Sequence, residues 1–136
     1  MLSREQSDSL IARARAAMKL AYSPYSGVKI GAAVLTKDRR IFAGCNVENA
    51  SYGLSCCAER NAIFKAVSEG CRELVAIAVV GVSEEFTSPC GACRQVMVEF
   101  NPKMKVLRRG TDGFSGDTTA ERLLPSSFGP KGLSKR

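Results

Sequence analysis

Apolar residues along the chain recur with either helical or strand-like spacing. Over residues 4–21 they return every three or four positions, after a capping-box pattern formed by Ser3 and Gln6, and this predicts a helix. Two apolar, β-branched stretches at residues 28–36 and 41–47 are separated by a short polar segment, which predicts a β-hairpin. The first third of the chain is therefore expected to form one helix and two antiparallel strands.

The rest of the chain alternates between helix and strand patterns. Residues 57–69 carry one apolar stripe at helical spacing, and the almost wholly apolar segment 74–82 is typical of a strand covered on both faces. Shorter elements follow in chain order: a helix over 90–100, a strand over 105–108, a turn over 110–117, a short helix over 119–124 and an irregular tail. The order α-β-β-α-β-α-β predicts an α/β fold, a mixed β-sheet sandwiched by helices in a single domain over residues 1–136.

Composition narrows the class of function. Hydrophobic residues make up 45% of the chain and charged residues 24%, which is typical of a globular protein. No apolar run approaches the ~18 residues of a membrane helix, and the N-terminus lacks the apolar core of a signal peptide, so we expect a cytoplasmic protein with no membrane partner. The chain has no histidine, which excludes Ser-His-Asp and Cys-His catalysis and any imidazole metal ligand.

The cysteines point to a metal rather than to disulfides. Six cysteines could pair, but a cytosolic chain with a sizeable core is expected to keep them reduced. Cys90 and Cys93 form a C-x2-C pair at one predicted helix start and Cys57 stands at another, where backbone N–H groups favour thiolate. Three thiolates could hold a zinc ion and leave its fourth position open for water, as in catalytic zinc sites. Glu59, close to Cys57, could move a proton between that water and a leaving group.

Other interpretations of the cysteines are weaker. The C-x2-C pair could be a redox site, or Cys45 or Cys56 could complete a purely structural zinc site with a fourth protein ligand. Cys45, in a predicted strand, and Cys71, after a predicted helix, are expected to be small packed residues. The side chain of Cys56 should point away from that of Cys57.

The segments Cys57-Ala58-Glu59 and Pro89-Cys90-Gly91-Ala92-Cys93 match the zinc-deaminase signature in its three-cysteine form. The chain resembles the small homotetrameric cytidine deaminases of pyrimidine salvage, and the similarity runs from about residue 15 to residue 130. The resemblance implies a three-layer fold and one Zn²⁺ per protomer. It also implies hydrolytic deamination of cytidine and deoxycytidine to uridine and deoxyuridine, with Glu59 as the catalytic proton shuttle. The matching segments outside the signature are 22–26, 31–33, 44–49, 60–70, 94–96 and 123–125, together with Ser88.

The resemblance also implies substrate-binding residues. Asn46 and Glu48 match a ribose-binding pair, and their spacing places both on one face of a strand, although a polar strand end at the surface would look the same. Arg60 matches an arginine that donates to a ligand sulfur and offsets the charge of three thiolates around Zn²⁺; the alternative is a solvent-facing helix residue. The other positions implied for substrate are Ala58 in the same subunit, the segment with Ala50 and Tyr52 from a neighbouring subunit, and Phe128 from another.

One position departs from the family. Val28 stands where the family usually has an aromatic that stacks on the pyrimidine, which favours as an alternative a modified cytosine nucleoside such as blasticidin S. A second alternative is a polynucleotide deaminase, since the net charge is +7 and cations cluster at 103–109. No aromatics interleave with those cations, as a strand-stacking surface would require, so we do not expect a nucleic-acid partner. A non-catalytic zinc module fits poorly with Glu59 beside an open coordination position.

Overall fold

Alternating side chains along the central strands build two cores, one on each face of a single sheet. The computed structural model describes residues 2–133. Strand β1 (Gly31–Thr36) buries Ala32 and Val34 on one face and Ala33 and Leu35 on the other. Strand β3 (Leu74–Gly81) alternates in the same way. A sheet that is apolar on both faces needs a helical layer on each side.

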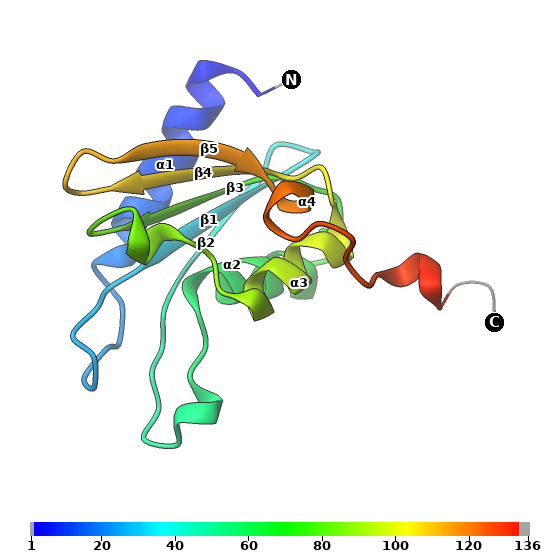
Figure 1. Ribbon diagram of the computed structural model, residues 1–136. Helices are drawn as coiled ribbons and strands as arrows, with labels where there is room; N and C mark the ends of the chain where they lie inside the picture. Colours follow the sequence, from blue (N-terminus) through cyan, green and yellow to red (C-terminus); the bar gives the residue numbers. More distant parts are fainter. Residues whose placement is uncertain (1, 134–136) are drawn as a thin grey trace.

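The helices supply those two layers, as Figure 1 shows. Helix α1 (Arg4–Met18) packs on one face, and its start is fixed by the predicted capping box of Ser3 and Gln6. Helices α2 (Ala58–Ser68) and α3 (Gly91–Phe100) cover the other face. The predicted fold class, a mixed sheet sandwiched by helices, is confirmed.

The sheet has five strands in the order β2-β1-β3-β4-β5. Strand β1 pairs antiparallel with both β2 (Ile41–Cys45) and β3, so β2 and β3 run in the same direction. Strand β4 (Lys105–Gly110) is parallel to β3, and β5 (Ser115–Thr119) is antiparallel to β4. The remaining elements are α4 (Ala120–Leu123) and single 3-10 turns at Tyr52–Leu54, Glu85–Thr87 and Pro130–Gly132.

Helix α2 lies unusually close to β2, and a glycine makes this possible. A Cβ on Gly44 would stand 2.6 Å from the backbone nitrogen of Ala62 and 3.1 Å from the carbonyl oxygen of Ala58. The α2 side chains Asn61 and Lys65 donate to the β2 carbonyls of Cys45 and Ala43, at 2.8 and 2.6 Å. This contact fixes the start of α2, the part of the helix that carries the candidate chemistry.

Strand β5 was not predicted: its residues 115–117 fall in the predicted turn at 110–117, and Thr119 falls at the start of the predicted short helix. Its residues, Ser-Gly-Asp-Thr-Thr, include no large apolar side chain and two residue types that are depleted in strands. The strand forms because its backbone pairs with β4 at the sheet edge, where an ion pair between Arg109 and Asp117, at 2.6 Å, supports it. Neither interaction leaves a local pattern in the sequence.

The first helix and the two hairpin strands are shorter in the structure than predicted. The first helix ends at Met18 rather than residue 21, because the backbone of Tyr22 forms a bridge with Val47 and must leave the helix first. The hairpin strands are shorter than 28–36 and 41–47, because the side chain of Asn46 occupies the backbone groups of Val28 and Ile30.

Within residues 2–133, no helix has the length and apolarity needed to cross a membrane.

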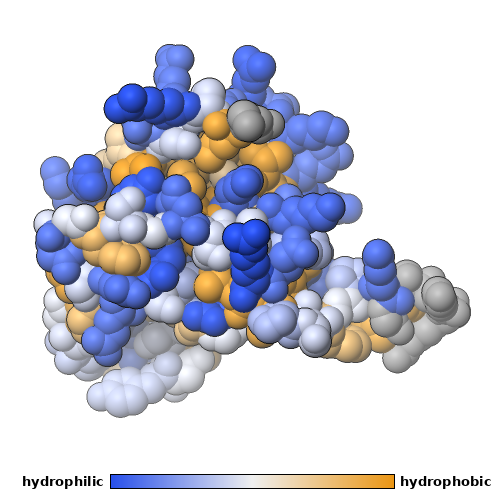
Figure 2. Space-filling view, turned by 45° about the horizontal axis from the view of Figure 1, so that its top comes forward, coloured by the Kyte–Doolittle hydropathy of each residue, from blue (hydrophilic) through white to orange (hydrophobic). Residues whose placement is uncertain are grey.

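The basic residues that cluster at 103–109 in the sequence have two kinds of environment in the structure. Arg108 donates to the carbonyl oxygens of Thr87 and Glu84, and Arg109 is paired with Asp117. Lys103 and Lys105 remain exposed. Figure 2 shows hydrophilic side chains distributed over one face of the molecule among smaller hydrophobic patches, rather than gathered into one groove.

Candidate metal centre and active site

Three cysteine sulfurs converge at the end of the sheet where strands β2 and β3 terminate. The Sγ atoms of Cys57 and Cys90 are 3.7 Å apart, those of Cys90 and Cys93 are 3.4 Å apart, and all three lie within 4.8 Å of one another. With Zn–S bonds of about 2.3 Å, the edge of a regular tetrahedron is about 3.8 Å. The spacing of the sulfurs therefore fits three corners of a zinc tetrahedron, and their chemistry fits a thiophilic ion.

Strand direction brings these cysteines together. Because β2 and β3 run the same way, the segments that follow them leave the sheet at the same edge, and each leads into a helix start. Cys57 is the N-cap of α2, and Cys90 is the N-cap of α3, where its sulfur accepts from the backbone N–H of Cys93 at 3.4 Å. The positive ends of two helices therefore face the sulfurs and favour thiolate.

The protonation of the cysteines follows from their mutual contacts. The Cys93 thiol donates to the Cys57 sulfur, and Arg60 and Cys90 donate as well, which lowers the pKa of Cys57 from 9.0 to about 5 despite burial. The same contact and burial raise the pKa of Cys93. The lowered pKa of Cys57 favours the thiolate form that metal binding requires.

Arg60 lies against the sulfurs rather than in solvent. Its Nη2 donates to the Sγ of Cys57 at 3.3 Å, and this bond raises the pKa of the guanidinium further. The Nε of Arg60 is buried and has no hydrogen-bond partner among the described residues. A fixed positive charge at this point would offset part of the negative charge of three thiolates around a bound Zn²⁺.

Glu59 is a buried carboxyl group close to the sulfurs. Only 5% of its surface is exposed, and burial raises its pKa from 4.5 to about 7, an effect that the nearby Cys57 reinforces. Glu59 does not join the group of potential ligand atoms formed by the described residues, so it is available for proton transfer. A carboxyl group that titrates near neutrality can both accept and donate a proton.

Asn46 and Glu48 hold the neighbouring loop. The Asn46 carboxamide accepts from the backbone N–H of Ile30 and donates to the carbonyl oxygen of Val28, both at 2.8 Å. The Glu48 carboxylate accepts from the backbone N–H of Tyr25 at 2.9 Å, and from both the backbone N–H and the hydroxyl of Ser26. The hydroxyl of Ser26 is the main cause that lowers the pKa of Glu48.

Aromatic and small residues of the predicted site lie on exposed segments. The segment between β2 and α2 extends from the body as an arm that carries Ala50 and Tyr52, and the tail beyond α4 also leads away from the body (Figure 1). Tyr52 is 76% exposed and Phe128 is 65% exposed. Tyr25 and Tyr52 form an edge-to-face pair with ring centroids 6.1 Å apart, and Val28 is half-buried.

A family model described as the cytidine and deoxycytidylate deaminase zinc-binding region matches residues 4–108. The chain belongs to this family. Within this deaminase, Cys57, Cys90 and Cys93 are the residues that would hold the zinc ion.

Individual relatives of the deaminase agree over nearly its whole length. The cytidine deaminase of Sporosarcina psychrophila is 48% identical over 128 residues, covering 93% of this chain and 94% of that protein. The cytidine deaminase of Halalkalibacterium halodurans is 51% identical over 120 residues, covering 88% and 91%. The crystal structure of cytidine deaminase from Burkholderia pseudomallei superimposes with a TM-score of 0.86 at 51% identity, covering 89% of this chain and 98% of that one.

The other cysteines of the deaminase stay outside the metal group. Among the described residues, neither Cys45 nor Cys56 joins the three sulfurs, so neither completes a structural four-ligand site. Cys71 is packed in the core, as predicted, whereas Cys45, at the end of β2, is only half-buried. Burial raises the pKa of Cys56, which favours an uncharged thiol.

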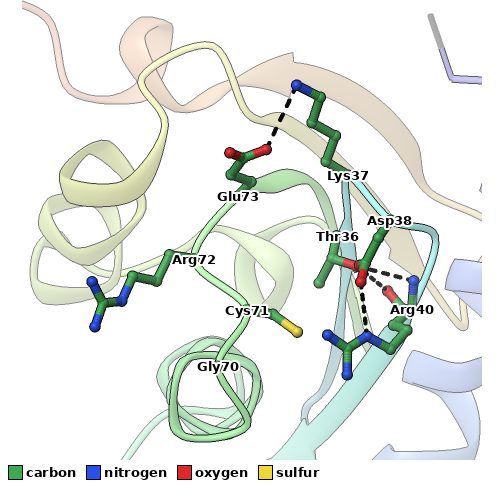
Figure 3. A pocket seen from close by; sticks show the side chains of 8 residues that line it. All are labelled: Thr36, Lys37, Asp38, Arg40, Gly70, Cys71, Arg72 and Glu73. Atoms are coloured by element: carbon green, nitrogen blue, oxygen red, sulfur yellow. Dashed lines mark hydrogen bonds and ion pairs between the residues drawn. The ribbon is translucent and has the colours of Figure 1, made fainter.

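A hollow of about 630 Å³ lies at the opposite end of the sheet, where β1 ends and β2 and β3 begin (Figure 3). All of its charged side chains except Arg72 pair with one another: Lys37 with Glu73 at 3.6 Å, and Arg40 with Asp38 at 3.1 Å. It contains none of the zinc ligands, so the chemistry of the deaminase is assigned to the sulfur group and not to this hollow. The lining residues are Thr36, Lys37, Asp38, Arg40, Gly70, Cys71, Arg72 and Glu73.

Proposed function

We propose that this deaminase hydrolyses the C4 amino group of cytidine and deoxycytidine, releasing ammonia and leaving uridine and deoxyuridine. The observation that carries the proposal is the buried Glu59 beside three converging cysteine sulfurs with no fourth ligand among the described residues. The relatives that match over nearly the whole chain are named cytidine deaminases. Pyrimidine salvage is the corresponding metabolic role.

The chemistry divides between the metal and the chain. When bound, zinc supplies Lewis acidity, which brings the pKa of water near 7. Glu59 accepts the proton that water loses and donates it to N3 of the pyrimidine, which makes C4 electrophilic. After the C4–O bond forms, Glu59 accepts the proton of the new C4 hydroxyl and donates it to the amino nitrogen, so that the C4–N bond breaks, the C4 carbonyl forms and ammonia leaves. A group whose pKa is about 7 can make both transfers near neutral pH.

Asn46 and Glu48 retain capacity for a ribose. A carboxamide has two N–H donors, and Asn46 uses one of them on Val28. A carboxylate offers about four acceptor positions, and Glu48 uses three on Tyr25 and Ser26. One donor and one acceptor position remain for sugar hydroxyls. The side chain of Ala58, which also belongs to the proposed substrate site, is fully buried in the core.

We also propose that the protein is a homotetramer whose active sites are shared. Tyr52 and Phe128 are aromatic side chains that a single protomer leaves largely exposed. A second copy that receives Tyr52 and the segment near Ala50, and another that receives Phe128, would bury them against substrate. Three reduced thiols at the metal site support a cytoplasmic location, and the one sheet supports a single catalytic domain over residues 1–136.

The decisive experiment combines metal analysis with ultraviolet-monitored deamination of cytidine, deoxycytidine, deoxycytidine monophosphate, blasticidin S and a cytosine oligonucleotide. We expect one zinc per protomer and turnover of the two nucleosides, with Glu59→Gln as the inactive, zinc-loaded control. Zinc-loaded protein that turns over neither nucleoside would overturn the proposal.

A modified cytosine nucleoside is the second candidate substrate. It is favoured by Val28, which offers no aromatic face to a pyrimidine, and faster turnover of blasticidin S than of cytidine would identify it. The division of the basic cluster, with Arg108 and Arg109 occupied by neighbouring groups, argues against the oligonucleotide.

A further inference from the structure

One guanidinium joins the loop before Cys90 to the C-terminal segment. Arg94 donates from Nε to the carbonyl oxygen of Pro89 at 2.7 Å and from Nη2 to the hydroxyl of Ser88 at 3.0 Å. Its Nη1 donates to the carbonyl oxygen of Leu123 at 2.9 Å, across 29 residues of sequence. All three nitrogens of a half-buried side chain are therefore used, on two separate segments.

One segment leads directly to a metal ligand, and the other leads to Phe128. Ser88 and Pro89 come immediately before the N-cap ligand Cys90, and Pro89 is fully buried. Leu123 ends α4, and the chain then runs to Phe128, whose carbonyl oxygen accepts from Nε2 of Gln95 at 2.8 Å. Consecutive residues of α3 thus hold the C-terminal segment at two points.

We propose that Arg94 is a positioning residue that couples the zinc-ligand loop to the C-terminal segment. It fixes the loop that carries Cys90 while it fixes the segment that presents Phe128. The importance of Phe128 rests on the proposed function, but the coupling itself does not. Arg94 lies in a segment that matches the family, but its role has no local signature because its acceptors are a hydroxyl and two backbone carbonyls.

Arginine is well suited to this connection. The planar guanidinium presents donors in several fixed directions, whereas the ammonium of lysine is a single point. A lysine at 94 would keep the charge but would lose the three separate nitrogens that each serve one acceptor. A charge-conserving substitution therefore separates the geometry of Arg94 from its charge.

The test uses the zinc-loaded protein with three variants. Arg94→Lys removes the planar guanidinium with its three donor nitrogens, and Ser88→Ala removes only the loop hydroxyl. Arg122→Lys is the matched control, because it changes an exposed arginine of α4 in the same way. For each, we would measure zinc transfer to a chromophoric chelator, hydrogen exchange by mass spectrometry, and unfolding by denaturant. None of these measurements uses a substrate, so a failure of the proposed function would leave the result interpretable.

In Arg94→Lys, we expect zinc transfer at least fivefold faster. Hydrogen exchange should be at least fivefold faster in both segments 84–93 and 119–128, and unchanged in segment 4–36. Ser88→Ala should affect only 84–93, and Arg122→Lys neither segment. Wild-type values in Arg94→Lys would overturn the coupling, as would faster exchange in only one of the two segments. A uniform rise in exchange with a lower denaturation midpoint would also overturn it, because Arg94 would then support only the fold.

Discussion

The Glu48 carboxylate accepts hydrogen bonds from both the hydroxyl and the backbone N–H of Ser26, 22 residues earlier in the chain. A residue expected to meet the sugar therefore also holds the loop that carries Val28. The loop position and the ribose contact are linked through one carboxylate.

This contact predicts a pH-dependent effect of Glu48→Gln. The Ser26 hydroxyl lowers the pKa of Glu48 below 4.5 in the folded state, so its stabilising effect is present above pH 4.5 and is lost as pH falls through the folded value. Glu48→Gln should therefore have a lower Tm than wild type at pH 6, and the difference should shrink toward pH 3. Thermal unfolding of both proteins across this range is the measurement. A difference that does not vary with pH would contradict it.

The second prediction concerns proton transfer by Glu59. Glutamine keeps the size and hydrogen bonding of this buried side chain but cannot carry a proton, so kcat for cytidine should fall at least ~10²-fold in Glu59→Gln. Zinc content, measured by metal analysis, should equal that of wild type. A variant that retains near-normal kcat would remove Glu59 from the mechanism.

The third prediction concerns the missing aromatic at position 28. A flat aromatic face against a base contributes about 1–3 kcal/mol, so Val28→Phe should lower KM for cytidine by roughly 5- to 100-fold. We expect the smaller end, because overpacking offsets part of the gain. Steady-state kinetics of wild type and variant on cytidine and blasticidin S would measure the change in KM. Loss of cytidine turnover in the variant would instead show a pocket shaped around valine.

The fourth prediction concerns the shared active site. A chain that ends before Ser126 lacks Phe128 but keeps Leu123, the acceptor for Arg94. Its deaminase activity should fall, while zinc, measured in the purified protein, stays bound. Light scattering of the full chain should give a tetramer, and a fully active monomer would refute the shared site.

The fifth prediction concerns the contact between α2 and β2. A methyl group at Gly44 would meet backbone atoms of α2 that cannot move alone, and such overpacking costs about 1–3 kcal/mol. Gly44→Ala should lower the free energy of unfolding by this amount and weaken zinc retention. Gly129→Ala is the matched control, because its Cβ would meet no atom within 4 Å. Equal unfolding curves for the two variants would contradict the close approach.

The parts of the molecule that the sequence predicted are those with local patterns. The metal cysteines stand at helix starts, and the helices and central strands bury regular apolar positions, so both features are visible in short windows of sequence. Strand β5 and two of the three partners of Arg94 depend on backbone groups, which are the same for every residue type and therefore leave no pattern in the sequence. The hydrogen bonds of Asn46 and Glu48 to residues 25–30 were hidden for the same reason.

The separation of Cys57 and Cys90 along the chain has a consequence for folding. An ion bound to both sulfurs would close a loop across 33 positions, as a covalent cross-link does. By the loop-closure relation for cross-linked chains, a loop of this length removes about 3–4 kcal/mol of conformational entropy from the denatured ensemble. The metal required for chemistry would then also stabilise the folded state as a cross-link. Zinc starvation should therefore increase the fraction of unfolded chains as well as abolish turnover.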